Sequence, residues 1–151
     1  MPWKTSHGQH DGGGALGDDA PAVQDRLLAS VVEWTGVPRE QLQLGVDGCT
    51  TLCYGLPLQA MAVAYARLVT AAAPAARQVR EAMMRHPGLV AGTGRFCTEA
   101  MTALPGELVA KIGAEGVYSA GLPRPGLGIA LKIEDGDMRS APLALVGVLR
   151  Q

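Results

Sequence analysis

The chain has 151 residues, of which 48% are hydrophobic, and its formal net charge is -1 at pH 7. Because it has neither a basic stripe nor a polybasic segment, this composition excludes the usual electrostatic binding of nucleic acid or of a membrane surface. No apolar stretch reaches the roughly 18 residues of a membrane-spanning helix, and three cysteines are too few for a disulfide scaffold, so we expect one soluble, cytoplasmic domain that handles a small molecule.

The front part of the chain carries the signals of helices. Residues 1–15 show no apolar periodicity and contain three consecutive glycines, which predicts a flexible leader. Apolar residues then recur at helical spacing up to Gly36, which predicts a helix of about 14 residues. The segment GVDGC (45–49) has the composition of a sharp loop. Two more amphipathic helices are predicted over 57–73 and 74–86.

The pattern changes to strands in the last third of the chain. A short helix is predicted over 98–104, and a terminal helix over 141–149 that could cover a sheet. Between them, glycine-rich turns link three segments of strand character, 108–112, 115–121 and 127–134. Helices, then an antiparallel sheet, then one C-terminal helix make an α+β fold.

Lys111 interrupts the apolar run LVAKIGAEGV. Burying an ammonium group is costly unless it is paired or neutralised, so a lysine here has two explanations. In a desolvated pocket the amine acts as a general base or donates a hydrogen bond to an oxyanion. On an edge strand it extends to water, and periodicity alone favours this second explanation. Gly113, two residues later, leaves room for a ligand along the strand.

Two further segments carry residues with ligand chemistry. In GVDGC, glycines flank Asp47 and Cys49 and let both side chains point into a cleft. Cys49 and Cys53 have C-x3-C spacing, but a second pair of ligands for a complete zinc site is missing. Arg95 is a candidate for binding a carboxylate through two hydrogen bonds, and Glu115 is a candidate general acid. The alternatives are a surface arginine and a solvated turn residue.

Five segments together resemble one protein family. In order, they are GVDGC (45–49), LPLQAMAVAYARL (56–68), EAMMRHPGLVAGTGR (81–95), PGELVAKIGAEGV (105–117) and GLGIALKIEDGDMR (126–139). In these motifs and in their spacing, residues 16–150 resemble the second half of the bacterial L-asparaginase II family, the type found in rhizobia. The resemblance is specific, because five separate motifs would have to coincide.

The resemblance implies a fold similar to that of the serine β-lactamases and glutaminases. It also implies hydrolysis of L-asparagine to L-aspartate and ammonia through serine and lysine pairs, with Lys111 as the catalytic strand lysine and Cys49 as one ligand of a zinc ion near the substrate. Asp47 matches the aspartate of the family's GVDGC, and Cys97 matches a cysteine near the site in some members. The expected substrate-binding residues are Asp47, Arg95, Cys97, Gly113 and Glu115.

The chain departs from the family pattern in what precedes these motifs. The family's Ser-x-x-Lys element, its second catalytic serine and its Cys-Ser-Gly-Lys-His stretch, which supplies further zinc ligands, have no counterpart here. We therefore expect a truncated, C-terminal asparaginase II-like domain over 16–151 that does not hydrolyse asparagine alone. The alternatives are a non-catalytic small-molecule-binding or subunit protein that pairs with a separate N-terminal half, and a structural remnant. Uncovered sheet edges favour a homo-oligomer.

Overall fold

A computed structural model describes residues 20–48 and 51–150, so the leader predicted over 1–15, and Cys49, lie outside the described residues. The chain is α+β, as the order of its elements shows. These are α1 (Ala20–Thr35), the 3₁₀ turn η1 (Arg39–Gln41), β1 (Gln43–Val46), β2 (Leu52–Gly55), α2 (Leu58–Thr70), α3 (Pro74–Arg85), α4 (Pro87–Ala91), α5 (Phe96–Ala103), β3 (Val109–Ile112), β4 (Val117–Leu122), β5 (Leu127–Lys132) and α6 (Ser140–Leu149).

The predicted helices and the three predicted strands are confirmed, with small shifts at their ends. The largest shift is in α2, which ends at Thr70 instead of residue 73. Ala71 and Ala73 are extended, with ψ of 131° and 130°. For Ala73 the physical reason is that Pro74 disfavours the helical conformation of the residue before it.

Apolar periodicity does not predict the β1–β2 hairpin. The loop predicted over 45–49 is wrong at its first two residues, because Gly45 and Val46 belong to β1. All four residues of β1 are exposed, so no alternation of buried and exposed positions marks the strand in the sequence. The short helix α4 likewise has no signal of its own beyond Pro87 at its first turn.

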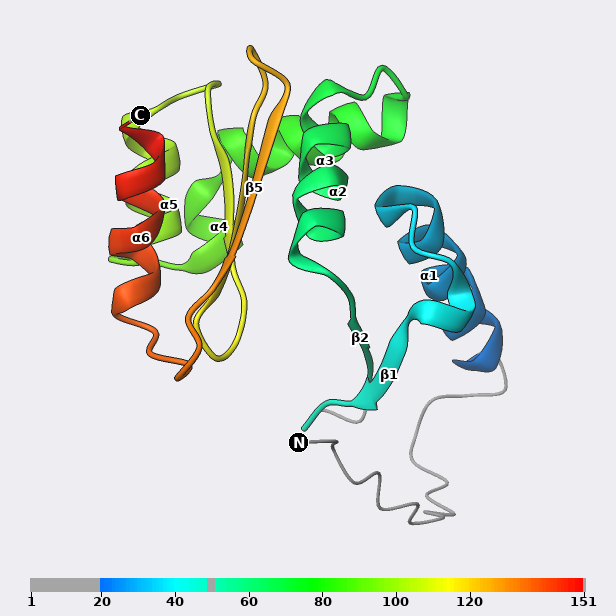
Figure 1. The fold of residues 1–151 in the computed structure, drawn as a ribbon. Helices are drawn as coiled ribbons and strands as arrows, with labels where there is room; N and C mark the ends of the chain where they lie inside the picture. Colours follow the sequence, from blue (N-terminus) through cyan, green and yellow to red (C-terminus); the bar gives the residue numbers. More distant parts are fainter. Residues whose placement is uncertain (1–19, 49–50, 151) are drawn as a thin grey trace.

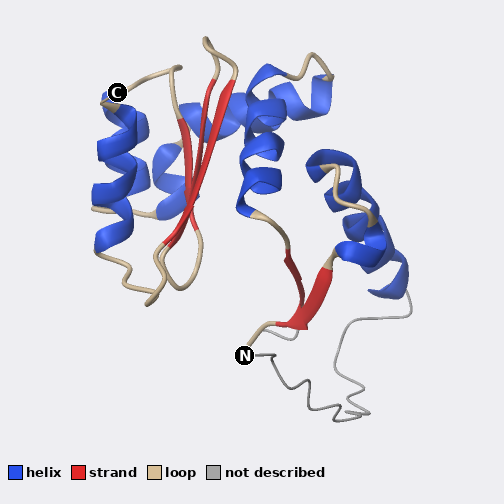
Figure 2. Cartoon of the chain, in the orientation of Figure 1, coloured by secondary structure: helices blue, strands red, loops and turns tan. Residues whose placement is uncertain are grey.

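The main sheet lies between two helical layers (Figures 1 and 2). α2 packs on one face, against β4 and β5, while α5 and α6 pack on the other face. α1 and the β1–β2 hairpin lie on the far side of α2 from this sheet (Figure 1). In the described part of the chain, none of the helices combines the length and the hydropathy that crossing a membrane requires.

The strand order is β3-β4-β5, all antiparallel, with Lys111 opposite Ser119 and Tyr118 opposite Leu131. Because side chains alternate along a strand, one face of the sheet is apolar and forms the main core with α5 and α6. The buried residues of this core are Cys97, Met101, Leu108, Ala110, Tyr118, Ala120, Ile129, Ala141 and Leu145. A smaller core of Leu28, Val37 and Leu42 joins α1 to the hairpin.

Candidate active site

Lys111 lies on the face of the sheet that α2 covers. Its cross-strand neighbour Ser119 donates a hydrogen bond to Met61 of α2. Because directly paired residues of two antiparallel strands lie on the same face, Lys111 also lies on the face that α2 covers. The Lys111 side chain is exposed, and its Nζ donates a 2.7 Å hydrogen bond to the carbonyl oxygen of Ile112. Among residues 20–48 and 51–150 it forms no salt bridge. The ammonium group therefore keeps donors for a further acceptor, in water or on a ligand.

Ser119 places a hydroxyl group directly across the strand pair from Lys111. Only 3% of Ser119 is exposed, and its Oγ lies 2.9 Å from Sδ of Met61. α2 therefore covers this hydroxyl and does not present it to a substrate in this conformation. No sequence motif marks Ser119, because only the pairing register of β3 and β4 brings it beside the lysine.

The predicted residue Gly113 begins the turn after β3. Its N–H donates a 2.9 Å hydrogen bond to the carbonyl oxygen of Val117. A Cβ atom on Gly113 would lie 3.0 Å from Cβ of Val117, which is tighter than an ordinary contact. The close approach of Val117 in this narrow hairpin is therefore a second reason for a glycine at position 113, besides room for a ligand.

Glu115 lies at the tip of the same turn, and its side chain is exposed. Its φ is 51° and that of Gly116 is 71°, the two left-handed residues of a type I′ turn. Nζ of Lys132 holds the turn from β5, with hydrogen bonds of 2.5 Å to the carbonyl oxygen of Glu115 and 2.7 Å to that of Ile133. Lys111, Gly113 and Glu115 thus lie together at one end of the sheet.

Arg95 and Cys97 lie at the start of α5, on the other side of the sheet from Lys111. Arg95 immediately precedes the helix and is exposed. Cys97 is fully buried, and its Sγ lies 2.8 Å from Oη of Tyr118. Burial, and then the hydrogen bond to Cys97, raise the pKa of Tyr118. Because the adjacent residues Tyr118 and Ser119 point to opposite faces of β4, the sheet separates Cys97 from the lysine.

Asp47 lies in the turn of the β1–β2 hairpin. Its N–H donates to the carbonyl oxygen of Thr51 at 2.9 Å, and its Oδ1 accepts the N–H of Gly48 at 2.7 Å. A Cβ atom on Gly45 would lie 3.1 Å from Sγ of Cys53, so this thiol lies over Gly45, two residues before Asp47. Within the described ranges, no group of three or more His, Cys, Asp or Glu side chains is placed to hold a metal ion.

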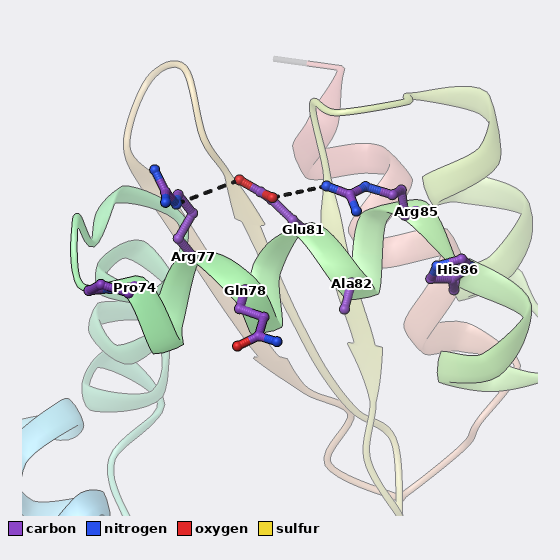
Figure 3. A pocket seen from close by; sticks show the side chains of 7 residues that line it. All are labelled: Pro74, Arg77, Gln78, Glu81, Ala82, Arg85 and His86. Atoms are coloured by element: carbon purple, nitrogen blue, oxygen red, sulfur yellow. Dashed lines mark hydrogen bonds and ion pairs between the residues drawn. The ribbon is translucent and has the colours of Figure 1, made fainter.

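Three surface hollows that described residues line lie away from all of these residues. One, of about 460 Å³, runs along α3, where Glu81 lies between Arg77 and Arg85 at 3.9 Å and 3.0 Å (Figure 3). Its lining comes only from α3 and His86, so it is the polar outer face of one helix. A second, of about 420 Å³, is apolar and lies where Trp34, Tyr65 and Val79 meet.

The fold and the candidate site define a class: an α+β domain with a lysine on an edge strand, directly before a tight glycine turn. The family model of L-asparaginase II matches residues 16–151. This match covers most of the chain, so the chain belongs to the L-asparaginase II family, and the resemblance drawn from the five motifs is confirmed. No curated protein matches the chain.

Proposed function

We propose that this chain is the lysine-bearing part of an asparaginase II-type amidohydrolase, that its substrate is L-asparagine, and that Lys111 is its catalytic residue. The observation that carries the proposal is the position of Lys111 in a chain of this family. It is an exposed amine on an edge strand, directly before the turn that contains Gly113 and Glu115.

Hydrolysis of an amide needs a nucleophile, a base that activates it, and donors that stabilise the oxyanion. The amine of Lys111 is suited to the second or third of these tasks, since among the described residues it donates one hydrogen bond, to the carbonyl oxygen of Ile112. The hydroxyl across the strand pair, that of Ser119, is covered by Met61. The described residues therefore offer a base or an oxyanion donor but present no cross-strand nucleophile beside it, and we expect that the isolated chain does not turn over asparagine.

Substrate recognition is proposed at the same end of the sheet. Glu115 carries an exposed carboxylate in the turn after Lys111, which is suited to the α-ammonium group of asparagine. Arg95 and Cys97 stay predictions, since a substrate held by Lys111 lies on the other face of the sheet. Asp47 also stays a prediction.

We also propose that the β1–β2 hairpin contributes ligands to a zinc ion. Cys49 would be one ligand, and Asp47 and Cys53 of the hairpin carry donor groups that zinc accepts. When bound near the substrate, zinc would act as a Lewis acid toward it.

A second candidate function is a binding subunit that pairs with a separate chain carrying the nucleophile. The covered hydroxyl of Ser119 favours this candidate. Ser119 is the cross-strand partner of Lys111, and its hydroxyl is hydrogen-bonded to Met61 and is not open to a substrate.

Ammonia release and amide chemical shifts test the proposal together. We expect no ammonia from L-asparagine above a mock-purified control. We expect L-asparagine to shift the amide signals of residues 111–116 in the wild type and in Lys132→Arg, but not in Lys111→Ala. Turnover that disappears in Lys111→Ala would show that the chain is a complete catalyst. Unchanged signals at 111–116 would show that the substrate does not bind there.

A further inference from the structure

The thioether of Met138 joins the segment before α6 to the turn after β3. Its Sδ accepts a hydrogen bond of 3.0 Å from the N–H of Gly116. Gly116, with φ of 71°, is the second left-handed residue of the type I′ turn that also carries Glu115. In such a turn the N–H of this residue points away from the turn's own hydrogen bond, here that from the N–H of Val117 to Ala114, so its acceptor comes from outside.

The segment around Met138 is held firmly against this turn. The hydroxyl of Ser140 donates a 2.6 Å hydrogen bond to Oδ2 of Asp137, the residue before Met138. A Cβ atom on Gly136 would lie 3.6 Å from Cα of Glu115, so the two turns are in van der Waals contact. A change at the sulfur atom of Met138 is therefore transmitted to the turn.

Met138 is also the methionine of the described residues that an oxidant reaches most easily. Its side chain is 39% exposed, whereas that of Met101 is 1% exposed. Met61, whose Sδ also accepts a hydrogen bond, is partly buried between α2 and the sheet, and Met83 and Met84 of α3 are partly buried as well. Access to the sulfur atom governs how fast a methionine is oxidised, so the folded chain favours reaction at Met138.

We propose that Met138 is a site of reversible oxidation by peroxide, and that its sulfoxide changes the turn that carries Glu115 and Gly116. A lone pair of the sulfur atom attacks one oxygen of hydrogen peroxide, the O–O bond breaks, and the other oxygen leaves as water. The sulfur atom is oxidised by two electrons and the peroxide is reduced. A methionine sulfoxide reductase reverses the step with a dithiol, which becomes a disulfide while the sulfoxide oxygen leaves as water. The inference does not depend on the proposed function.

The sulfoxide changes the acceptor that the N–H of Gly116 meets. At 3.0 Å, nitrogen and sulfur leave no room for an oxygen atom between them. A thioether sulfur is a weak acceptor, whereas the sulfoxide oxygen is a polar one that lies one bond further out. The N–H of Gly116 therefore pairs with an atom at a different position, and the turn moves with it. Because this turn directly follows Lys111 and Ile112, the change reaches the candidate active site.

Limited oxidation, followed by peptide mass spectrometry and NMR, tests the site. Folded wild type and Met138→Leu are treated with equimolar hydrogen peroxide. We expect the peptide that contains Met138 to gain one oxygen atom several-fold faster than those that contain Met61 or Met101. We expect the amide signal of Gly116 to move in the wild type and to stay in place in Met138→Leu, which retains the other methionines. Methionine sulfoxide reductases for both sulfoxide epimers, with dithiothreitol, should restore the original signal.

Oxidation of Met61 or Met101 ahead of Met138 in the folded chain would overturn the proposal. So would a sulfoxide at Met138 that leaves the amide signal of Gly116 unmoved, because the change would then stay in the side chain. If Met138→Leu fails to fold, partly oxidised wild type decides alone. It should show two Gly116 signals whose ratio equals the sulfoxide fraction of the Met138 peptide, and a ratio that does not follow this fraction also overturns the proposal.

Discussion

Gly128 of β5 lies directly beneath the backbone of α2, so that a Cβ atom on Gly128 would lie 1.8 Å from the carbonyl oxygen of Ala62. Gly121 of β4 repeats the arrangement, since a Cβ atom there would lie 2.5 Å from Cγ1 of Val69. These two glycines set how closely α2 approaches the sheet. The same face carries Lys111, so they also shape the surroundings of the candidate active site.

Gly128→Ala should therefore destabilise the chain strongly. The added methyl group meets backbone atoms that cannot rotate away, so α2 must move off the sheet, at a cost of about 3 kcal/mol in the free energy of unfolding. Gly147→Ala in α6 is the matched control: no atom lies within 4 Å of its added Cβ, and alanine in a helix gains up to about 1 kcal/mol over glycine. Urea denaturation followed by circular dichroism measures both, and equal effects of the two substitutions would contradict the close approach.

Glu115→Asn should stabilise the chain. The left-handed conformation of Glu115, with φ of 51°, is unfavourable for glutamate and is better tolerated by asparagine. We expect a gain of about 0.5–1 kcal/mol in the free energy of unfolding, measured by thermal and urea denaturation. Ala114→Asn, one residue earlier and outside the left-handed pair, is the control. A loss of stability in Glu115→Asn would mean that the glutamate side chain stabilises the turn in another way.

The main sheet could be predicted from the sequence because its strands alternate and its turns are marked by glycine. Periodicity correctly places Lys111 on a strand, and it favours the exposed edge position that the structure gives it. The β1–β2 hairpin could not be predicted in the same way. Its strands are short, β1 is exposed at every position, and its pairing depends on contacts between α1 and the residues around Tyr54.

The arrangement of the candidate site depends on register, which the sequence does not reveal. Cys97 is buried against Tyr118 in the main core, and Ser119 lies on the opposite face beside Lys111. A shift of one residue in the pairing would exchange these faces. No local pattern therefore predicts which cysteine, serine or arginine lies on the same face as the lysine.

Acid should weaken the start of α6 through Asp137. The hydrogen bond from Ser140 and then that from the N–H of Arg139 lower the pKa of Asp137 from 3.8 to about 2. Because the folded-state pKa lies below the unfolded one, the stabilisation is present above about pH 4 and is lost as the pH falls toward 2. Ser140→Ala should raise the pKa of Asp137, which a carboxyl titration by NMR measures. An unchanged value would show that the Ser140 hydrogen bond is absent in solution.

Alkali should weaken the packing of α2 through Tyr65. Burial, with a smaller contribution from Cys97, raises the pKa of Tyr65 from 10.0 to about 12. The stabilisation from the neutral phenol is therefore complete below pH 10 and is lost between pH 10 and pH 12, at about 1.4 kcal/mol for each pH unit. Tyr65→Phe, which cannot ionise, should lose less stability than the wild type over this range. Equal losses in the two proteins, or a Tyr65 phenolate that forms near pH 10, would show that the ring is not buried.

Dialysed protein should hold less than one zinc ion per chain. Tight zinc binding needs three or four protein ligands, and the Cys-Ser-Gly-Lys-His stretch that supplies further ligands in the family has no counterpart in this sequence. Asp47 and Cys53 both belong to the β1–β2 hairpin and lie within four residues of Cys49 in the sequence, so they are the residues that could replace the missing ligands. Metal analysis of the wild type, Cys49→Ser and Cys53→Ser separates the cases, with Cys97→Ser as the control, since its thiol is buried against Tyr118. One zinc per chain that is lost in both Cys49→Ser and Cys53→Ser would contradict the prediction, and it would assign the site to the hairpin.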